Sequence, residues 1–343
     1  MDGQHSARPS VGRILKIAAV ALILLLLLAF VVLQFLFRWS INQYYENSTP
    51  AFEIPGIYEG FVPQGFDYDG QNGLFIVSGY MNGDGASPVY LVEEDGDIRS
   101  RLTLTTHKGE PYTGHSGGIA VHGDYVYVAG GRGGYFYVYH YADFLAAGDE
   151  AVIECVGRFS TKVSDDDYVA VSFISDSDTH LWVGEFYDTD GYETLDSHKL
   201  YSPSGDWQQA LAVGFAFDEN AEFGISPTPD IAYSLPDKVQ GMCFDGGTVY
   251  LSTSRGFNTS HIYAYDAPKS HLISRITVLE TDVALYFLDS NTAFEIKAPP
   301  MAEEIVVLGG RLYIMSEFAS GKYILGRFFG GETCYSTNLS KYR

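Results

Sequence analysis

Five segments of this sequence share one pattern, and this repetition restricts the possible fold more than any other feature. Each segment has a short apolar strand, a turn rich in Asp, Gly or Ser, and a second strand ending in a small or polar residue. A loop and a third alternating strand follow. Such repeats indicate units that bury their apolar faces against one another. The five segments begin at Val62, His115, Tyr168, Val239 and Ala302.

The turns and strands inside each segment indicate β-hairpins. Residues 245–247 (DGG) and 309–310 (GG) readily adopt the positive φ angles that two-residue hairpin loops need. Residues 135–140 (YFYVYH) place aromatic side chains on both faces of a strand, because side chains alternate with a period of two. This pattern is typical of sheets stacked between neighbouring sheets.

The spacing of the units favours a ring of blades. Corresponding positions fall near residues 64, 117, 172, 240 and 304. The blades of a propeller are four-stranded sheets of about 40–50 residues, and they tolerate insertions in their loops. We therefore predict an all-β, five-bladed β-propeller over residues 51–330. A β-sandwich would not need five similar units.

A duplicated tetrapeptide predicts how the ring closes. The sequence AFEI occurs at residues 51–54 and again at residues 293–296. The later copy precedes the fifth unit, where the outer strand of the fourth blade is expected. The fifth unit itself reaches only three strands. We therefore predict that residues 51–57 supply its outer strand, which leaves no open sheet edge.

An apolar run near the N-terminus predicts one transmembrane helix. Residues 17–37 are apolar except for Gln34 and span roughly 30 Å as a helix, the thickness of a bilayer core. A cleaved signal peptide has a shorter apolar region of about 7–15 residues, followed by small residues at the cleavage site. Here Phe35, Leu36 and Phe37 end the run, so we predict an uncleaved signal-anchor.

The charges beside this run predict its orientation. Arg8, Arg13 and Lys16 precede the apolar run, and the positive-inside rule then places the N-terminus in the cytoplasm. The chain would be a single-pass protein of the cell membrane with an extracytoplasmic C-terminal domain. The predicted parts are a cytoplasmic tail (1–13), a transmembrane helix (14–38), a tether (39–50), the propeller (51–330) and a C-terminal tail (331–343).

The ectodomain is strongly acidic. The whole chain has a net charge of −22, and residues 1–38 carry +3, so the remainder carries −25. A domain with this charge is not expected to bind nucleic acid or anionic lipid head groups. It is compatible with cations, basic partners or divalent metals. The three cysteines have no zinc-binding spacing.

The ends of the innermost strands are the predicted ligand site, because propellers bind ligands on the loops at one end of the central channel. Aligning the units places an unusual mixture of arginines, carboxylates and other polar groups there, with Glu303 and Glu304 before the fifth inner strand. Ion pairs that tie the blades together are the alternative interpretation. The predicted ligand-binding residues are Gln64, Tyr80, His115, Arg132, Glu185, Gln240, Arg255 and Glu317.

Four of the residues at these strand ends are candidates for acid–base or metal chemistry: His115, Glu185, Glu304 and Glu317. Residues 114–118 (GHSGG) match the nucleophile-elbow motif of serine hydrolases, which requires a helix after the serine. The next residues alternate as a hairpin instead, so the glycines are expected to turn the backbone into the channel. His115 is either a general base, a metal ligand or a hydrogen-bonded structural histidine.

Two acidic runs are candidate cation sites. Residues 165–167 (DDD) and 176–178 (DSD) offer oxygen ligands that suit calcium, but neither has the EF-hand pattern. Solvated turns are the favoured interpretation. The sequence therefore identifies no definite cofactor, and a divalent cation such as calcium is the one candidate.

The repeated Asp/Gly hairpins and paired apolar strands of residues 51–330 resemble β-propellers of the strictosidine-synthase and gluconolactonase kind. The resemblance is one of fold only. Such propellers typically have six blades, which makes a six-bladed ring the alternative here. They also hold a channel metal on Glu, Asn and Asp, and this sequence has no matching ligand set.

Two functions follow from these observations. The first is a binding propeller whose channel mouth recognises a polar small molecule, a glycan or a protein, with Arg132 and Arg255 pairing with carboxylate or phosphate groups. The second is a hydrolase or lactonase, metal-assisted in one version, in which the candidate carboxylates and His115 act on the substrate. Because no complete catalytic set is present, the sequence favours binding.

Overall fold

The computed structural model describes residues 11–266, 272–291 and 293–342. The chain divides into two compact units, Met1–Asn42 and Gln43–Arg343. The first contains α1 (Val11–Ser40), which has no buried residue and is somewhat longer than the predicted span of 14–38. Its length and composition allow it to cross a membrane, although N-terminal signal sequences share these properties.

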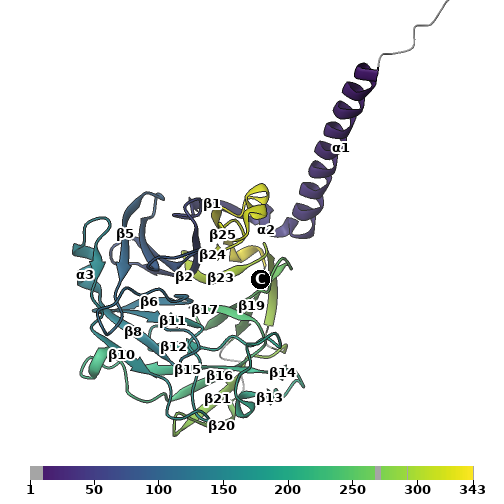
Figure 1. Ribbon diagram of the computed structural model, residues 1–343. Helices are drawn as coiled ribbons and strands as arrows, with labels where there is room; N and C mark the ends of the chain where they lie inside the picture. The colour runs from purple at the N-terminus through teal and green to yellow at the C-terminus, as the bar shows by residue number, and fades with distance from the viewer. Residues whose placement is uncertain (1–10, 267–271, 292, 343) are drawn as a thin grey trace, which may run out of the picture. The chain divides into compact units, whose positions relative to one another are not determined.

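The second unit is a five-bladed β-propeller, as predicted (Figure 1). Five innermost strands follow one another around the ring, and the last returns to the first. This closed order excludes the six-bladed alternative. The innermost strands are β2 (Phe61–Asp69), β6 (Ile119–His122), β11 (Phe173–Asp176), β17 (Val239–Asp245) and β23 (Ala302–Leu308).

In blades one and two, each sheet runs outward from the channel in chain order. Blade one continues through β3 (Leu74–Met81), β4 (Pro88–Glu93) and β5 (Ile98–Leu104), and β9 (Val152–Ile153) adds a parallel edge. Blade two continues through β7 (Tyr125–Ala129), β8 (Tyr135–His140) and β10 (Gly157–Ser160), with the short helix α3 (Tyr141–Ala146) after β8.

Insertions enlarge the third and fourth units. Blade three continues through β12 (His180–Gly184), β15 (Ala210–Ala216) and β16 (Ile231–Leu235), and its inserted loop holds η1 (Asp196–His198), β13 (Leu200–Tyr201) and β14 (Trp207–Gln208). A turn, η2 (Glu222–Gly224), joins β15 to β16. Blade four continues through β18 (Thr248–Thr253), β19 (Ser260–Asp266) and β22 (Ala293–Ala298). The hairpin of β20 (Leu272–Val278) and β21 (Thr281–Phe287) comes from the fourth unit but extends blade three.

The N-terminal strand closes the ring, as the duplicated tetrapeptide predicted. In blade five, β24 (Arg311–Ser316) and β25 (Thr333–Asn338) follow β23, and β1 (Ser48–Glu53) pairs antiparallel with β25 as the outermost strand. The second AFEI copy lies in β22, the outer strand of blade four. The closing strand is thus 48–53 rather than 51–57.

The third strand of blade five lies in residues that were predicted to be a C-terminal tail. Residues 324–329 form η4 (Ile324–Phe329) instead of a strand, and β25 comes after it. The sequence TCYSTN of β25 is polar and does not resemble a core strand, yet Cys334, Ser336 and Thr337 are buried by its neighbours. The chain then ends with η5 (Leu339–Lys341).

Aromatic and aliphatic side chains fill the spaces between blades. Along β8, Tyr137 and Tyr139 pack toward blade one, whereas Phe136 and Val138 pack toward blade three. This is the predicted period of two with apolar groups on both faces. Each blade is therefore buried on both sides, and the packing between blades holds the ring together.

Candidate functional site

A buried carboxyl group links the innermost strand of blade five to three other blades. Glu304, on β23, accepts hydrogen bonds from the backbone amides of Phe66 (2.7 Å), Ile174 (3.1 Å) and Ile119 (3.3 Å), which belong to three other blades. Gly118 allows this close approach, because a Cβ there would lie 2.2 Å from Ile174 N. Burial raises the pKa of Glu304 well above its usual range, although these three hydrogen bonds oppose the shift.

A polar cavity of about 320 Å³ lies among the ends of the inner strands and receives side chains from all five blades. These ends meet because corresponding positions in a propeller face the same end of the channel. Seven of the eight residues predicted to bind a ligand line this cavity: Gln64, Tyr80, His115, Arg132, Gln240, Arg255 and Glu317. We call it the channel-mouth cavity.

One side of the channel-mouth cavity carries two guanidinium groups around a single tyrosine ring. The Cζ atoms of Arg132 and Arg255 lie 5.1 and 5.4 Å from the ring centroid of Tyr192. Arg255 Nε is also 2.6 Å from Asp188 Oδ2. Arg132 donates to the carbonyl oxygen of Gly191 (2.6 Å) and has no carboxylate partner within the described residues. This side is therefore suited to an anionic group.

Two carboxyl groups of blade five, Glu303 and Glu317, also line the channel-mouth cavity. Glu317 Oε2 accepts a hydrogen bond from Gln64 Nε2 (3.1 Å). Burial raises the pKa of Glu317 to about 7, even though Lys322 and the bond from Gln64 act in the opposite direction. Burial, followed by the charges of Glu317 and Glu304, raises the pKa of Glu303 well above its usual range. These carboxyl groups can hold protons at neutral pH.

His115 and Lys322 adjoin these carboxyl groups. The ring of His115 stacks on Tyr80 with 4.4 Å between centroids. Burial, with Lys322 nearby, lowers the pKa of His115 to about 4, so the ring is neutral at physiological pH. Lys322 Nζ donates to Tyr80 Oη (3.0 Å) and lies 5.1 Å from the ring centroid of Tyr323. Although burial opposes the charge of Lys322, both tyrosines raise its pKa above the usual value.

Two of the predicted residues lie outside the channel-mouth cavity. Glu185 is buried and accepts hydrogen bonds from Leu211 N (3.1 Å) and Ala170 N (3.4 Å), with His198 Nδ1 at 2.9 Å. It points into its own blade because the inserted loop supplies His198 as a partner. The carboxyl group of Glu304 is likewise hydrogen-bonded to backbone amides of the neighbouring blades. Neither is positioned to reach a ligand in the cavity.

Sequence reasoning missed several residues of the cavity. Lys322 and Tyr323 follow β24 of blade five, and Phe186 and Tyr192 lie on the inserted loop of blade three, while Ser172 precedes β11. Ser172 and Phe186 neighbour aligned positions, so a wider window would have found them. Lys322 and Tyr192 lie several residues into the loops between the second and third strands, which are longer in blades five and three than in the other blades, so the alignment of the repeats contained no signal for them.

The GHSGG motif is not a nucleophile elbow. Ser116 is 1% exposed, and strands β6 and β7 follow it rather than a helix. Ser116 has a φ of 53°, which allows the chain to turn into the channel. Gly117 passes close to the neighbouring blade, where a Cβ would lie 2.4 Å from Ser172 O. The motif is thus part of the ring structure, as the hairpin pattern predicted.

The acidic runs make structural contacts. The carboxylate of Asp167 accepts hydrogen bonds from Leu279 N and Glu280 N, both 2.7 Å, and so attaches the β20–β21 hairpin to blade three. Asp165 pairs with Lys162, and Asp176 Oδ2 lies 3.3 Å from His122 Nδ1. Within residues 11–266, 272–291 and 293–342, no group of three or more His, Cys, Asp or Glu is arranged to hold a metal ion.

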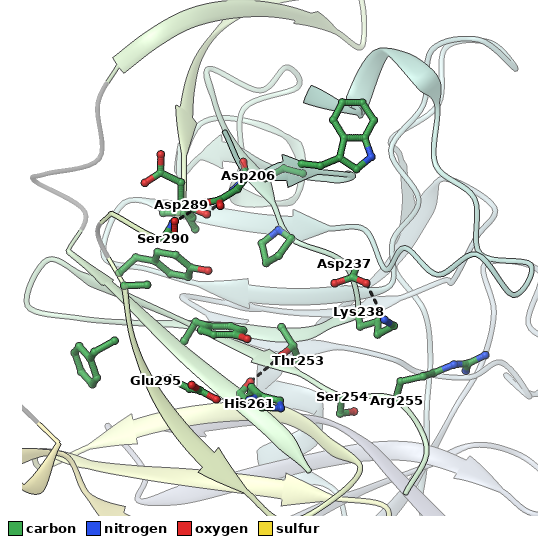
Figure 2. A pocket seen from close by; sticks show the side chains of 18 of the residues that line it. Asp206, Asp237, Lys238, Thr253, Ser254, Arg255, His261, Asp289, Ser290 and Glu295 are labelled. Carbon is green, nitrogen blue, oxygen red and sulfur yellow. Dashed lines mark hydrogen bonds and ion pairs between the residues drawn. The ribbon is translucent and has the colours of Figure 1, made fainter. Parts of the chain in front are cut away.

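A larger cavity of about 580 Å³ lies on blade four and the loops beside it. Figure 2 shows Asp206 beside Asp289 and Ser290, and Glu295 beside His261. Most of these polar groups bond with one another: Asp206 accepts from Ser290 N (2.8 Å), Lys238 pairs with Asp237 (2.7 Å), and His261 pairs with Glu295. Arg255 alone among the predicted residues lines it.

Comparisons with known proteins concern the fold alone. No known protein family and no curated sequence matches the chain. It is similar to a glutaminyl cyclase from Myxococcus xanthus (10% identity, TM-score 0.38, covering 78% of this chain and 89% of that one). It is also similar to a chain of a nidogen/laminin complex (9% identity, TM-score 0.37, covering 75% of this chain and 73% of that one). A third similar structure is BamB from Moraxella catarrhalis (11% identity, TM-score 0.34, covering 81% of this chain and 85% of that one). The fold and the site define a five-bladed β-propeller that has an N-terminal apolar helix and a polar cavity at one end of its channel.

Proposed function

We propose that this chain is a membrane-anchored β-propeller whose channel-mouth cavity binds a small polar ligand carrying a carboxylate or phosphate group. The observation that carries this proposal is Arg132. Its guanidinium group lines the cavity without a carboxylate partner in the described part of the chain, and the guanidinium group of Arg255 lies near the same ring, that of Tyr192. Two positive charges beside one ring favour binding of an anion in the cavity, and Arg binds carboxylate and phosphate with two parallel hydrogen bonds.

The basic side chains of the cavity support the same ligand class. The chain beyond residue 38 carries −25, which by itself disfavours anions, but the cavity gathers three cationic side chains, Arg132, Arg255 and Lys322. Burial raises the pKa of two carboxyl groups in the same cavity, Glu303 and Glu317, and a protonated carboxyl group can donate a hydrogen bond to a ligand oxygen. A ligand with an anionic group and neighbouring hydroxyl or carbonyl oxygens matches both sets of groups.

The anchor is the second part of the proposal. We assign α1 as an uncleaved transmembrane helix with its N-terminus in the cytoplasm, because Arg13 and Lys16 lie at that end. The propeller, including its channel-mouth cavity, would then face the extracytoplasmic side and act on ligands found there.

Calorimetric titration of the purified full chain with citrate and with inorganic phosphate at low salt tests the binding site. We expect Arg132→Gln to weaken binding of the better anion by at least about tenfold, since a hydrogen bond to a charged group contributes about 1.5–3 kcal/mol. Arg275→Gln is the matched control, because Arg275 is exposed and pairs with Asp282 away from the cavity. Equal binding by all three proteins, or no binding of either anion, would refute the assignment.

The buried carboxyl pair favours a second candidate function, that of a hydrolase or lactonase working by acid–base catalysis. Glu317, with a pKa of about 7, can both accept and donate a proton near neutral pH, and the neutral His115 lines the same cavity. In this version the arginines would stabilise a developing negative charge on the substrate.

Assays of ester and lactone hydrolysis separate the two functions. If the chain is an enzyme, Glu317→Gln should abolish turnover while leaving anion binding within a fewfold of the wild type. If the cavity only binds, neither protein turns over any substrate, and Arg132→Gln still loses affinity.

A further inference from the structure

A cluster of exposed apolar side chains lies on η4 and beside it. Ile324, Leu325 and Phe328 belong to η4, and each has 55–58% of its surface exposed. Two more exposed side chains extend the cluster: Tyr58 lies against Arg327, and Phe257 lies 6.1 Å from the ring of Tyr323. We call these five side chains the η4 surface. An exposed apolar patch of this kind marks an interaction site.

The segment that links the propeller to the apolar helix lies beside η4. Tyr45, in the short helix α2 (Asn42–Asn47), donates a hydrogen bond from its Oη to the carbonyl oxygen of Phe329 (3.3 Å). Its neighbour Tyr44 is buried, and both tyrosine rings contact Tyr335 on β25. Tyr45 is five residues from Ser40, where α1 ends, and five residues reach at most about 18 Å.

We propose that the η4 surface docks on the outer leaflet of the lipid bilayer that α1 crosses. This inference depends on the proposed membrane anchor, because the anchor brings η4 within reach of the bilayer. The three side chains of η4 would enter the interface, where Tyr58 and Phe257 also suit the boundary between acyl chains and head groups. Tyr45, whose side chain contacts η4 at Phe329, lies only five residues after the proposed anchor.

Apolar insertion rather than charge would drive this docking. Arg327 donates to the carbonyl oxygens of Ala319 and Ile57, both at 3.0 Å, and lies over the ring of Tyr58. Loss of solvent raises the pKa of Tyr58, and the nearby carboxylates of Glu332 and Glu53 add to this shift. With both signs of charge at the rim, the surface has no preference for anionic lipid, so it would bind a zwitterionic membrane.

The docking has a consequence for the channel-mouth cavity. Lys322 and Tyr323 line the cavity and immediately precede η4. Docking of η4 would therefore bring the blade-five rim of the cavity close to the membrane surface. Ligands that move along or are attached to that surface would reach the cavity most readily.

Fluorescence quenching in phosphatidylcholine nanodiscs tests the proposal on the full chain. Leu325→Cys and the control Tyr201→Cys, which replaces a side chain that is 70% exposed on blade three, are labelled with an environment-sensitive fluorophore. The unsubstituted protein, which retains its three free cysteines, reports background labelling. With doxyl-labelled lipid in the disc, we expect the Leu325→Cys label to lose at least half of its emission and the Tyr201→Cys label to change little.

The other outcomes of this experiment distinguish a failure of the proposed membrane anchor from a failure of the proposed docking. A chain that does not co-purify with nanodiscs refutes the anchor and, with it, the docking. A chain that co-purifies but shows no greater quenching at Leu325→Cys than at Tyr201→Cys refutes the docking alone. The Leu325→Cys label could instead be shielded from water without being quenched by lipid, in discs that hold two chains. This result would refute the docking and assign the η4 surface to a contact between two copies of the chain. The anion titrations remain independent of all three results.

Discussion

Replacing Glu317 by glutamine removes a carboxyl group whose ionisation opposes folding. Burial raises the pKa of Glu317 from 4.5 to about 7, so the folded protein holds this proton more tightly than the unfolded chain does. The resulting stability is fully present below about pH 4.5 and is lost as the pH rises through about 7. Glutamine keeps the shape of the side chain and can still accept the bond from Gln64 without carrying a charge.

The magnitude follows from the difference between the two pKa values. A shift of one pKa unit corresponds to about 1.4 kcal/mol. Between pH 4.5 and pH 8, the free energy of unfolding of the wild type should therefore fall by up to about 3 kcal/mol relative to that of Glu317→Gln. For a domain of this size, roughly 2 °C in melting temperature corresponds to 1 kcal/mol. We therefore expect the variant to melt about 6 °C above the wild type at pH 8 and close to it at pH 4.5.

The assay is thermal unfolding of the detergent-solubilised full chain, followed by tyrosine and tryptophan fluorescence between pH 4.5 and pH 8. Glu219→Gln is the matched control, because Glu219 is exposed on the loop after β15 and should give the same pH dependence as the wild type. A difference between the wild type and Glu317→Gln that stays constant with pH would show that Glu317 does not titrate in the cavity. A difference that grows on acidification would show that its charged form is the stabilised one.

Three further outcomes are expected. Burial and Lys322 lower the pKa of His115 to about 4, so the folded protein disfavours protonation of this ring. As the pH falls from about 6.5 to about 4, the free energy of unfolding of the wild type should therefore fall by up to about 3 kcal/mol relative to that of His115→Gln, which the same assay measures. Glu304→Ala leaves three buried backbone amides unpaired and should lower the unfolding free energy in urea by at least about 3 kcal/mol; a loss below about 1 kcal/mol would contradict its role in linking the blades. Phe52→Ala should lower the same free energy by about 3–5 kcal/mol, because Phe52 of the closing strand packs on Phe75 and Phe66; an unchanged urea midpoint would mean that β1 does not hold the ring closed.

Alignment of the repeats also predicted much of the candidate site. Corresponding positions of a propeller converge at one end of the channel, so Arg132 and Arg255, which are far apart in the sequence, could be expected to meet. The same reasoning failed for Glu185. Its aligned position is at the channel mouth, but the inserted loop of blade three brings His198 to within 2.9 Å of its carboxylate, and the side chain turns inward.

The sequence alone determined the apolar helix, the all-β class, the number of blades and the closure by the N-terminal strand. All of these depend on local periodicity and on repetition, which the order of residues displays directly. Only the tertiary structure decided that Glu304 binds backbone amides of three other blades, that Lys322 and Tyr192 join the cavity, and that β25 belongs to blade five. These features depend on contacts between segments distant in the chain and on loops that differ in length from unit to unit, and neither leaves a periodic pattern in the sequence.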